Sequence, residues 1–224
     1  MQLKKFLSYF FDFSIEKRQS RFSGEVEVAL RQGQYMLSTH NAIYSFGNKY
    51  TSFDKAFRAT AIHNRKVESV LVLGFGLGSV VDLLERHPSI NNITAVDADD
   101  IIIELAKKYL QSGLKEKVRY VCADAEKFVA ENNTQYDLIL FDVFIGDLTP
   151  VQFMQPVFLK SLKGLIAPDG MLLYSKIDDS MRSRIENAQF ETNFSAVFSE
   201  AFSIDANGNK LFAWVNATKA AAEW

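Results

Sequence analysis

From residue 69 onward, short apolar segments alternate with stretches long enough to form helices. The apolar segments are residues 70–73, 93–96, 118–122, 136–141 and 171–174. Strands that are apolar on both faces and are joined by helix-length crossovers form parallel sheets covered by helices. The sequence therefore predicts an α/β fold built on a mostly parallel sheet.

Two antiparallel additions are expected beside this sheet. Residues 196–204 and 210–215 flank a turn that contains an Asn-Gly pair, which is typical of a β-hairpin. Between residues 25 and 46, short segments with alternating polarity are separated by turn residues, and they predict a small antiparallel sheet. A helix follows it, with Phe53, Phe57 and Ala61 at helical spacing.

Charge and composition exclude several classes of partner. The chain has 25 Lys and Arg against 27 Asp and Glu, so its net charge of −2 gives no general attraction for nucleic acid. The single Cys122 excludes an internal disulfide, and with only three histidines we expect no metal site. These counts suit a cytoplasmic compartment. No apolar run approaches the roughly 20 residues that span a bilayer, so no membrane partner is expected.

The N-terminal segment is rich in aromatic residues, with Phe6, Tyr9, Phe10 and Phe11 close together. Such side chains pack on the protein's own core or on a second subunit more often than on a membrane surface. The segment would therefore suit a homodimer.

A glycine-rich segment directly follows the first predicted parallel strand. Gly74, Gly76 and Gly78 alternate with Phe75 and Leu77. Glycines at such a point let the backbone turn sharply and let a ligand approach the start of a helix. The alternative is a tight strand-to-helix turn without a ligand. The spacing differs from Gly-x-Gly-x-x-Gly, which weakens the case for a dinucleotide.

Two aspartates follow the next two strands. Asp97 ends the second strand, where a carboxylate can accept both hydroxyls of a ribose. Asp124 follows the third strand, where it can accept the amino group of an adenine. The alternative for each is helix capping, which Asp99 or Asp100 could perform in place of Asp97. Both acids lie at the carboxyl edge of the predicted sheet, where ligands of open α/β sheets bind.

Residues 74–78, 96–99, 123–125 and 136–142 together resemble the class I S-adenosylmethionine-dependent methyltransferase fold. Their order and spacing are most similar to its spermidine synthase (polyamine aminopropyltransferase) branch, and the resemblance covers roughly residues 33–174. It implies a Rossmann-like, seven-stranded sheet and a cofactor that is S-adenosylmethionine or its decarboxylated form. The residues that the resemblance assigns to the cofactor are Gly74, Phe75, Gly76, Gly78, Asp97, Ala98, Asp124 and Ala125.

Three regions are expected along the chain. Residues 1–23 form an aromatic segment, residues 24–66 form the small β appendage with its helix, and residues 67–224 form the Rossmann-like nucleoside-binding domain.

The acceptor end departs from the aminopropyltransferase pattern. Asp142 keeps the first acid of the family's Asp-Ser-x-Asp-Pro, which helps to take a proton from the attacking amine, whereas Ile145 replaces the acid that grips the diamine. Leu77 replaces an acid that would hold the ammonium of the decarboxylated cofactor. Tyr44 replaces a glutamine, and Phe53 replaces a tyrosine whose hydroxyl has a catalytic role in the family.

These replacements predict a pocket that is more apolar than a polyamine site. Burying an ammonium without a carboxylate partner costs several kcal/mol. We therefore expect a small-molecule acceptor that is not polycationic. Asp142 is the candidate catalytic residue, with capping of its loop as the alternative. The weaker acceptor-pocket candidates are Tyr44, Phe53, Asp54, Phe144, Ile145 and Asp147.

Methyl transfer to an unknown small molecule is the favoured function. The uncharged Leu77 leads us to expect that intact S-adenosylmethionine binds in preference to its decarboxylated form. The first alternative is aminopropyl transfer, should other acids repair the pocket. The second is a catalytically silent nucleoside-binding or dimerisation module.

Overall fold

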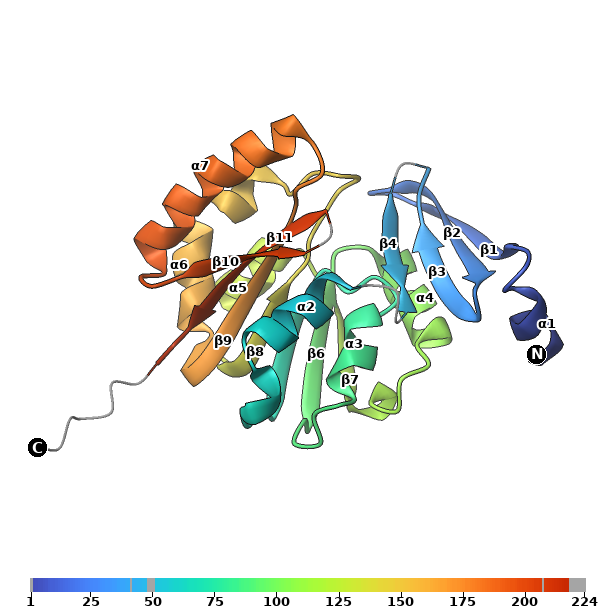
Figure 1. Cartoon of the computed structure of the whole chain (residues 1–224), viewed down its shortest axis with the longest axis horizontal. Helices are drawn as coiled ribbons and strands as arrows, with labels where there is room; N and C mark the ends of the chain where they lie inside the picture. Colours follow the sequence, from blue (N-terminus) through green and yellow to red (C-terminus); the bar gives the residue numbers. More distant parts are fainter. Residues whose placement is uncertain (1, 41, 48–50, 207, 218–224) are drawn as a thin grey trace, which may run out of the picture.

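The computed structural model describes residues 2–40, 42–47, 51–206 and 208–217. Figure 1 shows a small sheet near the N-terminus that stands beside a larger α/β body. Among the described residues, no helix is long and apolar enough to cross a membrane.

The larger sheet has seven strands in the order β10-β11-β9-β8-β5-β6-β7. Its parallel part is β5 (Ser69–Leu73), β6 (Asn92–Asp97), β7 (Val118–Cys122), β8 (Tyr136–Phe141) and β9 (Ile166–Ile177). The antiparallel hairpin of β10 (Phe202–Ala206) and β11 (Asn209–Val215) completes it through β9. The predicted fold class is confirmed. The chain order reverses between β5 and β8, and ligands of open α/β sheets bind at such a point.

Helices cover both faces of this sheet. One face carries α2 (Ser52–Ala59), α3 (Ser79–Leu84) and α4 (Asp100–Tyr109), and the other carries α5 (Ala125–Glu131), α6 (Pro156–Gly164) and α7 (Met181–Val197). Short 3-10 turns lie at Ile62–Asn64, Lys115–Lys117 and Val151–Met154. Each face buries its own apolar cluster against the strands, and the two clusters hold the sheet rigidly between the helical layers.

The chain between β9 and β10 differs from the prediction. Helix α7 was not expected, and it occupies the start of the predicted strand 196–204, so β10 begins only at Phe202. Ser180 starts this helix with a capping box, and Phe190 and Phe194 bury one side of it. The predicted helix 153–165 begins at Pro156, because proline favours the first turn of a helix. In the hairpin turn, Asn207 lies outside the described residues.

The small sheet has the order β1-β2-β3-β4. Its strands are β1 (Phe13–Ser20), β2 (Gly24–Arg31), β3 (Gln34–Ser38) and β4 (Ile43–Phe46), and the short helix α1 (Gln2–Leu7) precedes them. Strand β1 pairs with β2, so the expected boundary at residue 24 falls between two paired strands. An edge strand with charged residues gives little apolar signal in the sequence, which is why β1 was missed.

The small sheet is held on helix α4 by apolar and ionic contacts. Leu77 packs between Val28 and Leu37 of the sheet and Leu105 of the helix in one buried cluster. The Glu16 carboxylate accepts hydrogen bonds from Lys108 Nζ and Tyr109 Oη, each 2.6 Å long. These contacts place the small sheet over the carboxyl edge of the large one, beside the reversal point.

Candidate functional site

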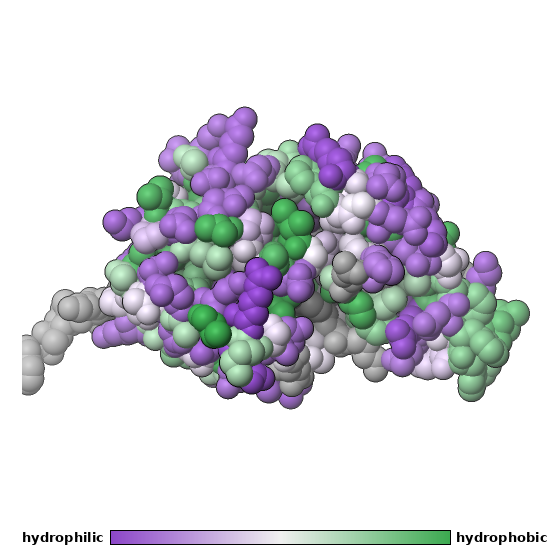
Figure 2. Space-filling view, turned by 90° about the horizontal axis from the view of Figure 1, so that it is seen from above, coloured by the Kyte–Doolittle hydropathy of each residue, from purple (hydrophilic) through white to green (hydrophobic). Residues whose placement is uncertain are grey.

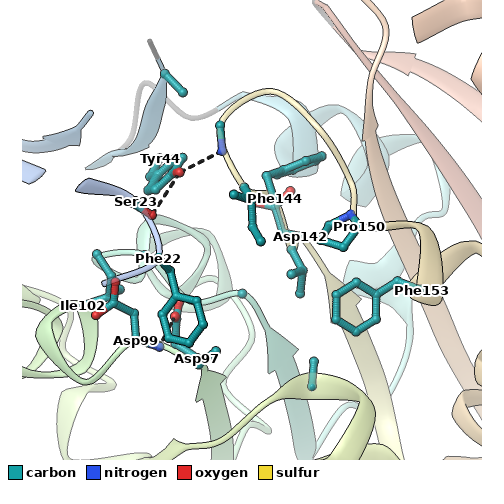
Figure 3. A pocket seen from close by; sticks show the side chains of 18 of the residues that line it. Phe22, Ser23, Tyr44, Asp97, Asp99, Ile102, Asp142, Phe144, Pro150 and Phe153 are labelled. Atoms are coloured by element: carbon teal, nitrogen blue, oxygen red, sulfur yellow. Dashed lines mark hydrogen bonds between the residues drawn. The ribbon is translucent and has the colours of Figure 1, made fainter. Parts of the chain in front are cut away.

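A cavity of about 630 Å³ lies at the carboxyl ends of β5 to β8. The glycine loop and the residues that follow β6, β7 and β8 line its inner part, and the small sheet contributes Phe22, Ser23 and Tyr44. Figure 3 shows Asp97 and Asp99 on one side of the cavity and Asp142 and Phe144 on the other. At the mouth, Ile43 and Ile145 are about half exposed, and the view from above shows hydrophobic side chains in the middle of this face.

The glycine loop makes two close backbone approaches. Gly74 has a φ of +81°, and a Cβ atom there would collide with the backbone carbonyl of Asp142. Gly76 has a φ of +53°, and its Cβ would lie 3.1 Å from the Tyr44 carbonyl oxygen. Both glycines line the cavity, whereas Gly78 and the buried ring of Phe75 do not. Gly78 instead makes the turn into α3, with a φ of +83°.

Replacing Gly74 with alanine is expected to destabilise the fold more than the same change at Gly146. Both residues have positive φ, but the space around a Gly146 Cβ is open. The backbone cost of about 1 kcal/mol is therefore common to both, and only Gly74 adds a steric clash worth roughly 2 kcal/mol more. Urea unfolding of the two variants measures this difference. Equal losses of stability would contradict the close approach to Asp142.

Asp97 lines the cavity, whereas Asp99, two residues later, caps helix α4. Its Oδ2 accepts a hydrogen bond from the Phe75 amide (3.1 Å), and its Oδ1 accepts one from the Asp99 amide (3.1 Å). Burial raises the pKa of Asp97 despite these bonds. Asp99 caps α4 by accepting from the Ile101 amide, and it also accepts the Ser20 hydroxyl. Asp99 therefore caps the helix, and Asp97 does not, although both line the cavity.

Asp124 combines capping with a place in the cavity wall. Its Oδ1 accepts hydrogen bonds from the Glu126 amide (2.9 Å) and the Lys127 amide (3.1 Å) at the start of α5. The alternative interpretation as a helix cap thus holds for this oxygen. Ala98 and Ala125 also line the cavity, next to the two aspartates. The structure therefore brings most of the predicted cofactor residues to one place.

The predicted acceptor residues divide into two groups. Tyr44, Asp142, Phe144, Ile145 and Asp147 all line the cavity.

Phe53 and Asp54 lie elsewhere, and their assignment to the acceptor pocket is corrected here. Phe53 is 1% exposed and packs in the core on the ring of Phe57. Asp54 forms ion pairs with Arg58 (2.7 Å) and Arg86 (2.8 Å). Both belong to α2, whose inward face packs on the sheet, so the apolar spacing that predicted this helix also turns it away from the cavity.

The cavity is more acidic than the sequence indicated. Leu77 is 5% exposed and packs against the small sheet, so it does not form the apolar wall that was expected of it. Six aspartates line the cavity, and its described lining residues include no Lys or Arg. These aspartates are Asp97, Asp99, Asp124, Asp142, Asp147 and Asp179. Asp179 was not predicted, although an Asp-Asp-Ser triplet after a parallel strand was a signal for it.

Tyr44 joins three segments across the mouth of the cavity. Its hydroxyl accepts a hydrogen bond from the Gly146 amide (3.0 Å) and lies 3.2 Å from the Ser23 hydroxyl. Figure 3 shows both interactions. Ile145 and Leu148 pair across the tip of the loop that follows β8, so Tyr44 attaches a compact loop to the small sheet.

Replacing Tyr44 with phenylalanine is expected to loosen this loop without unfolding the protein. A hydrogen bond contributes about 1 kcal/mol, so protection of the Gly146 amide against hydrogen exchange should fall by about tenfold when both bonds are lost. Tyr35→Phe on the neighbouring strand is the matched control. Unchanged protection of residues 143–149 would show that Tyr44 does not hold the loop.

Comparisons with known proteins agree with the geometry. A family model described as "Spermine/spermidine synthase domain" matches residues 57–205. A polyamine aminopropyltransferase from Vibrio vulnificus is 26% identical over 66% of this chain and 51% of its own length. An eEF1A lysine and N-terminal methyltransferase homolog from Drosophila melanogaster is 30% identical over 70% of this chain and 25% of its own length.

A solved structure has the same fold. The structure of a probable spermidine synthase from Corynebacterium glutamicum superposes with a TM-score of 0.76, at 16% identity, over 90% of this chain and 80% of that one. The chain spans about half the length of the Vibrio relative and a quarter of the Drosophila one.

Proposed function

The chain belongs to the spermine/spermidine synthase domain family, and from this premise we propose that it transfers an alkyl group from an adenosyl sulfonium nucleoside to an amine. The observation that carries the proposal is the lining of the cavity, with its six aspartates and no described cation. A sulfonium and an amine both carry positive charge, or develop it during transfer. An acidic cavity attracts such molecules and stabilises the charge.

The aspartates have different roles at different places in the cavity. Asp97 accepts the ribose hydroxyls, and Asp124 offers its remaining oxygen to the adenine. Asp142 lies against Gly74 at the reversal point of the sheet, across the cavity from Asp97. Asp147 and Asp179 are exposed at the rim and draw cations towards the mouth.

The transfer itself needs one displacement and one proton acceptor. The lone pair of the amine forms a bond to the carbon on sulfur, and the carbon–sulfur bond breaks with its electron pair moving to sulfur. The sulfonium becomes a neutral thioether, and the alkylated ammonium releases a proton to Asp142 and then to solvent. The protein mainly aligns the two reactants and excludes water.

Two groups are candidates for transfer. Methyl is the first, because the name of the Drosophila relative refers to a methyltransferase. Aminopropyl is the second, because the described lining offers no cation for the carboxylate of intact S-adenosylmethionine. The names of both relatives support an amine as acceptor, since one refers to a polyamine and the other to lysine and N-terminal amino groups.

Product analysis tests the proposal. The protein is incubated with S-adenosylmethionine or its decarboxylated form, together with diamines, amino alcohols and lysine-containing peptides. S-adenosylhomocysteine as product indicates methyl transfer, and methylthioadenosine indicates aminopropyl transfer. Nucleoside binding without either product across this screen would refute transfer and favour the silent module.

A further inference from the structure

A second, much smaller cavity adjoins the large one. It has a volume of about 30 Å³ and lies between the end of β9 and the start of α7. Asp147, Ile177 and Asp179 line both cavities, so the two adjoin. A space of this size holds one water molecule or one small polar group.

Asn187 of α7 lines this small cavity and carries an unsatisfied hydrogen-bond acceptor. The residue is 1% exposed, and its Nδ2 donates to the Ile177 carbonyl and to Asp178 Oδ1, both at 2.9 Å. Because both partners are acceptors, the orientation of the amide is fixed. Its Oδ1 is buried and has no hydrogen-bond partner among the described residues. A buried carbonyl oxygen of this kind calls for a donor.

Lys176 lines the same cavity and carries a buried hydrogen-bond donor. It is 3% exposed, and its Nζ lies 2.8 Å from Met154 Sδ and 5.1 Å from the centre of the Phe190 ring. Among the described residues, no carboxylate forms an ion pair with it, in contrast to Lys210, whose Nζ lies 3.1 Å from Glu191. The thioether sulfur of Met154 is a weak hydrogen-bond acceptor, so the buried ammonium of Lys176 lacks a strong one.

The charges around the small cavity select the kind of group that fits. Its other charged residues are Asp147, Asp179, Glu186 and Arg182, and Arg182 is already paired with Glu186 at 2.9 Å. The acids would attract an ammonium, but an ammonium carries the same charge as Lys176 and cannot accept a hydrogen bond from it. A carboxylate could not donate to Asn187 and would face the acids. A hydroxyl both donates and accepts and carries no charge.

We propose that this small cavity binds a distal hydroxyl group of the acceptor, with Asn187 Oδ1 accepting from it and Lys176 Nζ donating to it. The inference rests on the proposed function, because it takes the reacting amine to lie in the large cavity. The acceptor would then be an amine that also carries a hydroxyl group. Lys176 and Asn187 would determine the specificity of the protein for this acceptor.

Calorimetry with a matched ligand series tests the assignment. The probes are 4-amino-1-butanol, 1,4-diaminobutane, 4-aminobutanoate and butylamine, with their three- and five-carbon counterparts. Each is titrated into the protein saturated with S-adenosylhomocysteine or methylthioadenosine. In at least one chain length, the amino alcohol should bind about tenfold more tightly than the other three, since each analogue leaves a buried polar group unpaired or opposes a like charge.

Two variants and a control complete the test. Lys176→Met keeps the length of the side chain, and it should reduce the advantage of the alcohol over butylamine to threefold or less and admit the diamine. Asn187→Leu should reduce the same advantage, with a melting curve to show that the protein is folded. Lys160→Met, on the exposed side of α6, should change nothing.

The inference is overturned if the alcohol binds no more tightly than butylamine at any chain length, which would mean that the cavity holds only water. It is also overturned if Lys176→Met leaves the selectivity unchanged. The proposed function fails separately, when the series binds with the expected selectivity but no transfer product forms.

Discussion

Replacing Asp97 with alanine is expected to weaken the binding of S-adenosylhomocysteine by about a hundredfold. A carboxylate that accepts two ribose hydroxyls makes two charge-assisted hydrogen bonds, each contributing about 1.5 kcal/mol or more, and 1.4 kcal/mol corresponds to a factor of ten. Alanine also removes the acceptor for the Phe75 amide, which helps to hold the glycine loop against the cavity. Isothermal titration calorimetry measures the loss directly.

Asparagine at the same position separates ligand binding from stability. Burial raises the pKa of Asp97, so the folded protein keeps this proton at pH values where the unfolded chain has lost it. The contribution of Asp97 to stability is therefore largest at low pH and falls as pH rises through its folded pKa. Asp97→Asn should bind the nucleoside about tenfold more weakly. It should also lose less stability than the wild type as the pH rises above the ordinary pKa of an aspartate, about 3.9.

The exposed Asp205 supplies the control for both variants, because it lies on β10 and does not line the cavity. Asp205→Ala should bind the nucleoside as the wild type does. Wild-type affinity in Asp97→Ala would remove the basis for placing a ribose in this cavity.

Replacing Asp142 with asparagine is expected to lower kcat by a factor of about 100 to 1,000 and to leave nucleoside affinity within about threefold of the wild type. General-base catalysis by a positioned carboxylate contributes a factor of this size, and an amide cannot take the proton. Nucleoside affinity is preserved because Asp142 lies across the cavity from Asp97. Initial rates of product formation at saturating nucleoside and amine give kcat.

Asp205→Asn is the matched control for this change and should retain full activity. An unchanged kcat in Asp142→Asn would show that Asp142 is not the proton acceptor, and would favour the alternative that it caps its loop. A parallel loss of nucleoside binding would show that Asp142 belongs to the cofactor site and not to the acceptor.

The glycines and the two acids in the inner lining of the cavity could be predicted from the sequence because their signals are local. Gly74 and Gly76 lie directly after β5. Asp97 is the last residue of β6, and Asp124 lies just after β7. In a parallel sheet, strand ends converge at one edge whatever the details of packing. Knowing the strands was therefore enough to bring these residues together.

The acceptor end could not be predicted in this way, because its residues depend on how separate elements pack. Phe53 and Leu77 were expected in the pocket and are buried against other elements. Asp179 joins the cavity from the end of β9, next to the unpredicted helix α7. A position along the chain does not reveal which side of a helix faces the cavity, nor which loop folds over it.

The sequence by itself determined the α/β architecture, the edge of the sheet that carries the cavity, and the presence of Asp97 and Asp124 in its lining, because hydrophobic periodicity and strand order specify these features. Only the tertiary structure decided that the cavity is acidic, that Tyr44 attaches the loop to the small sheet, and that Lys176 and Asn187 face one small cavity. Those features arise from contacts between residues more than ten positions apart along the chain, and their geometry exists only once the layers have packed.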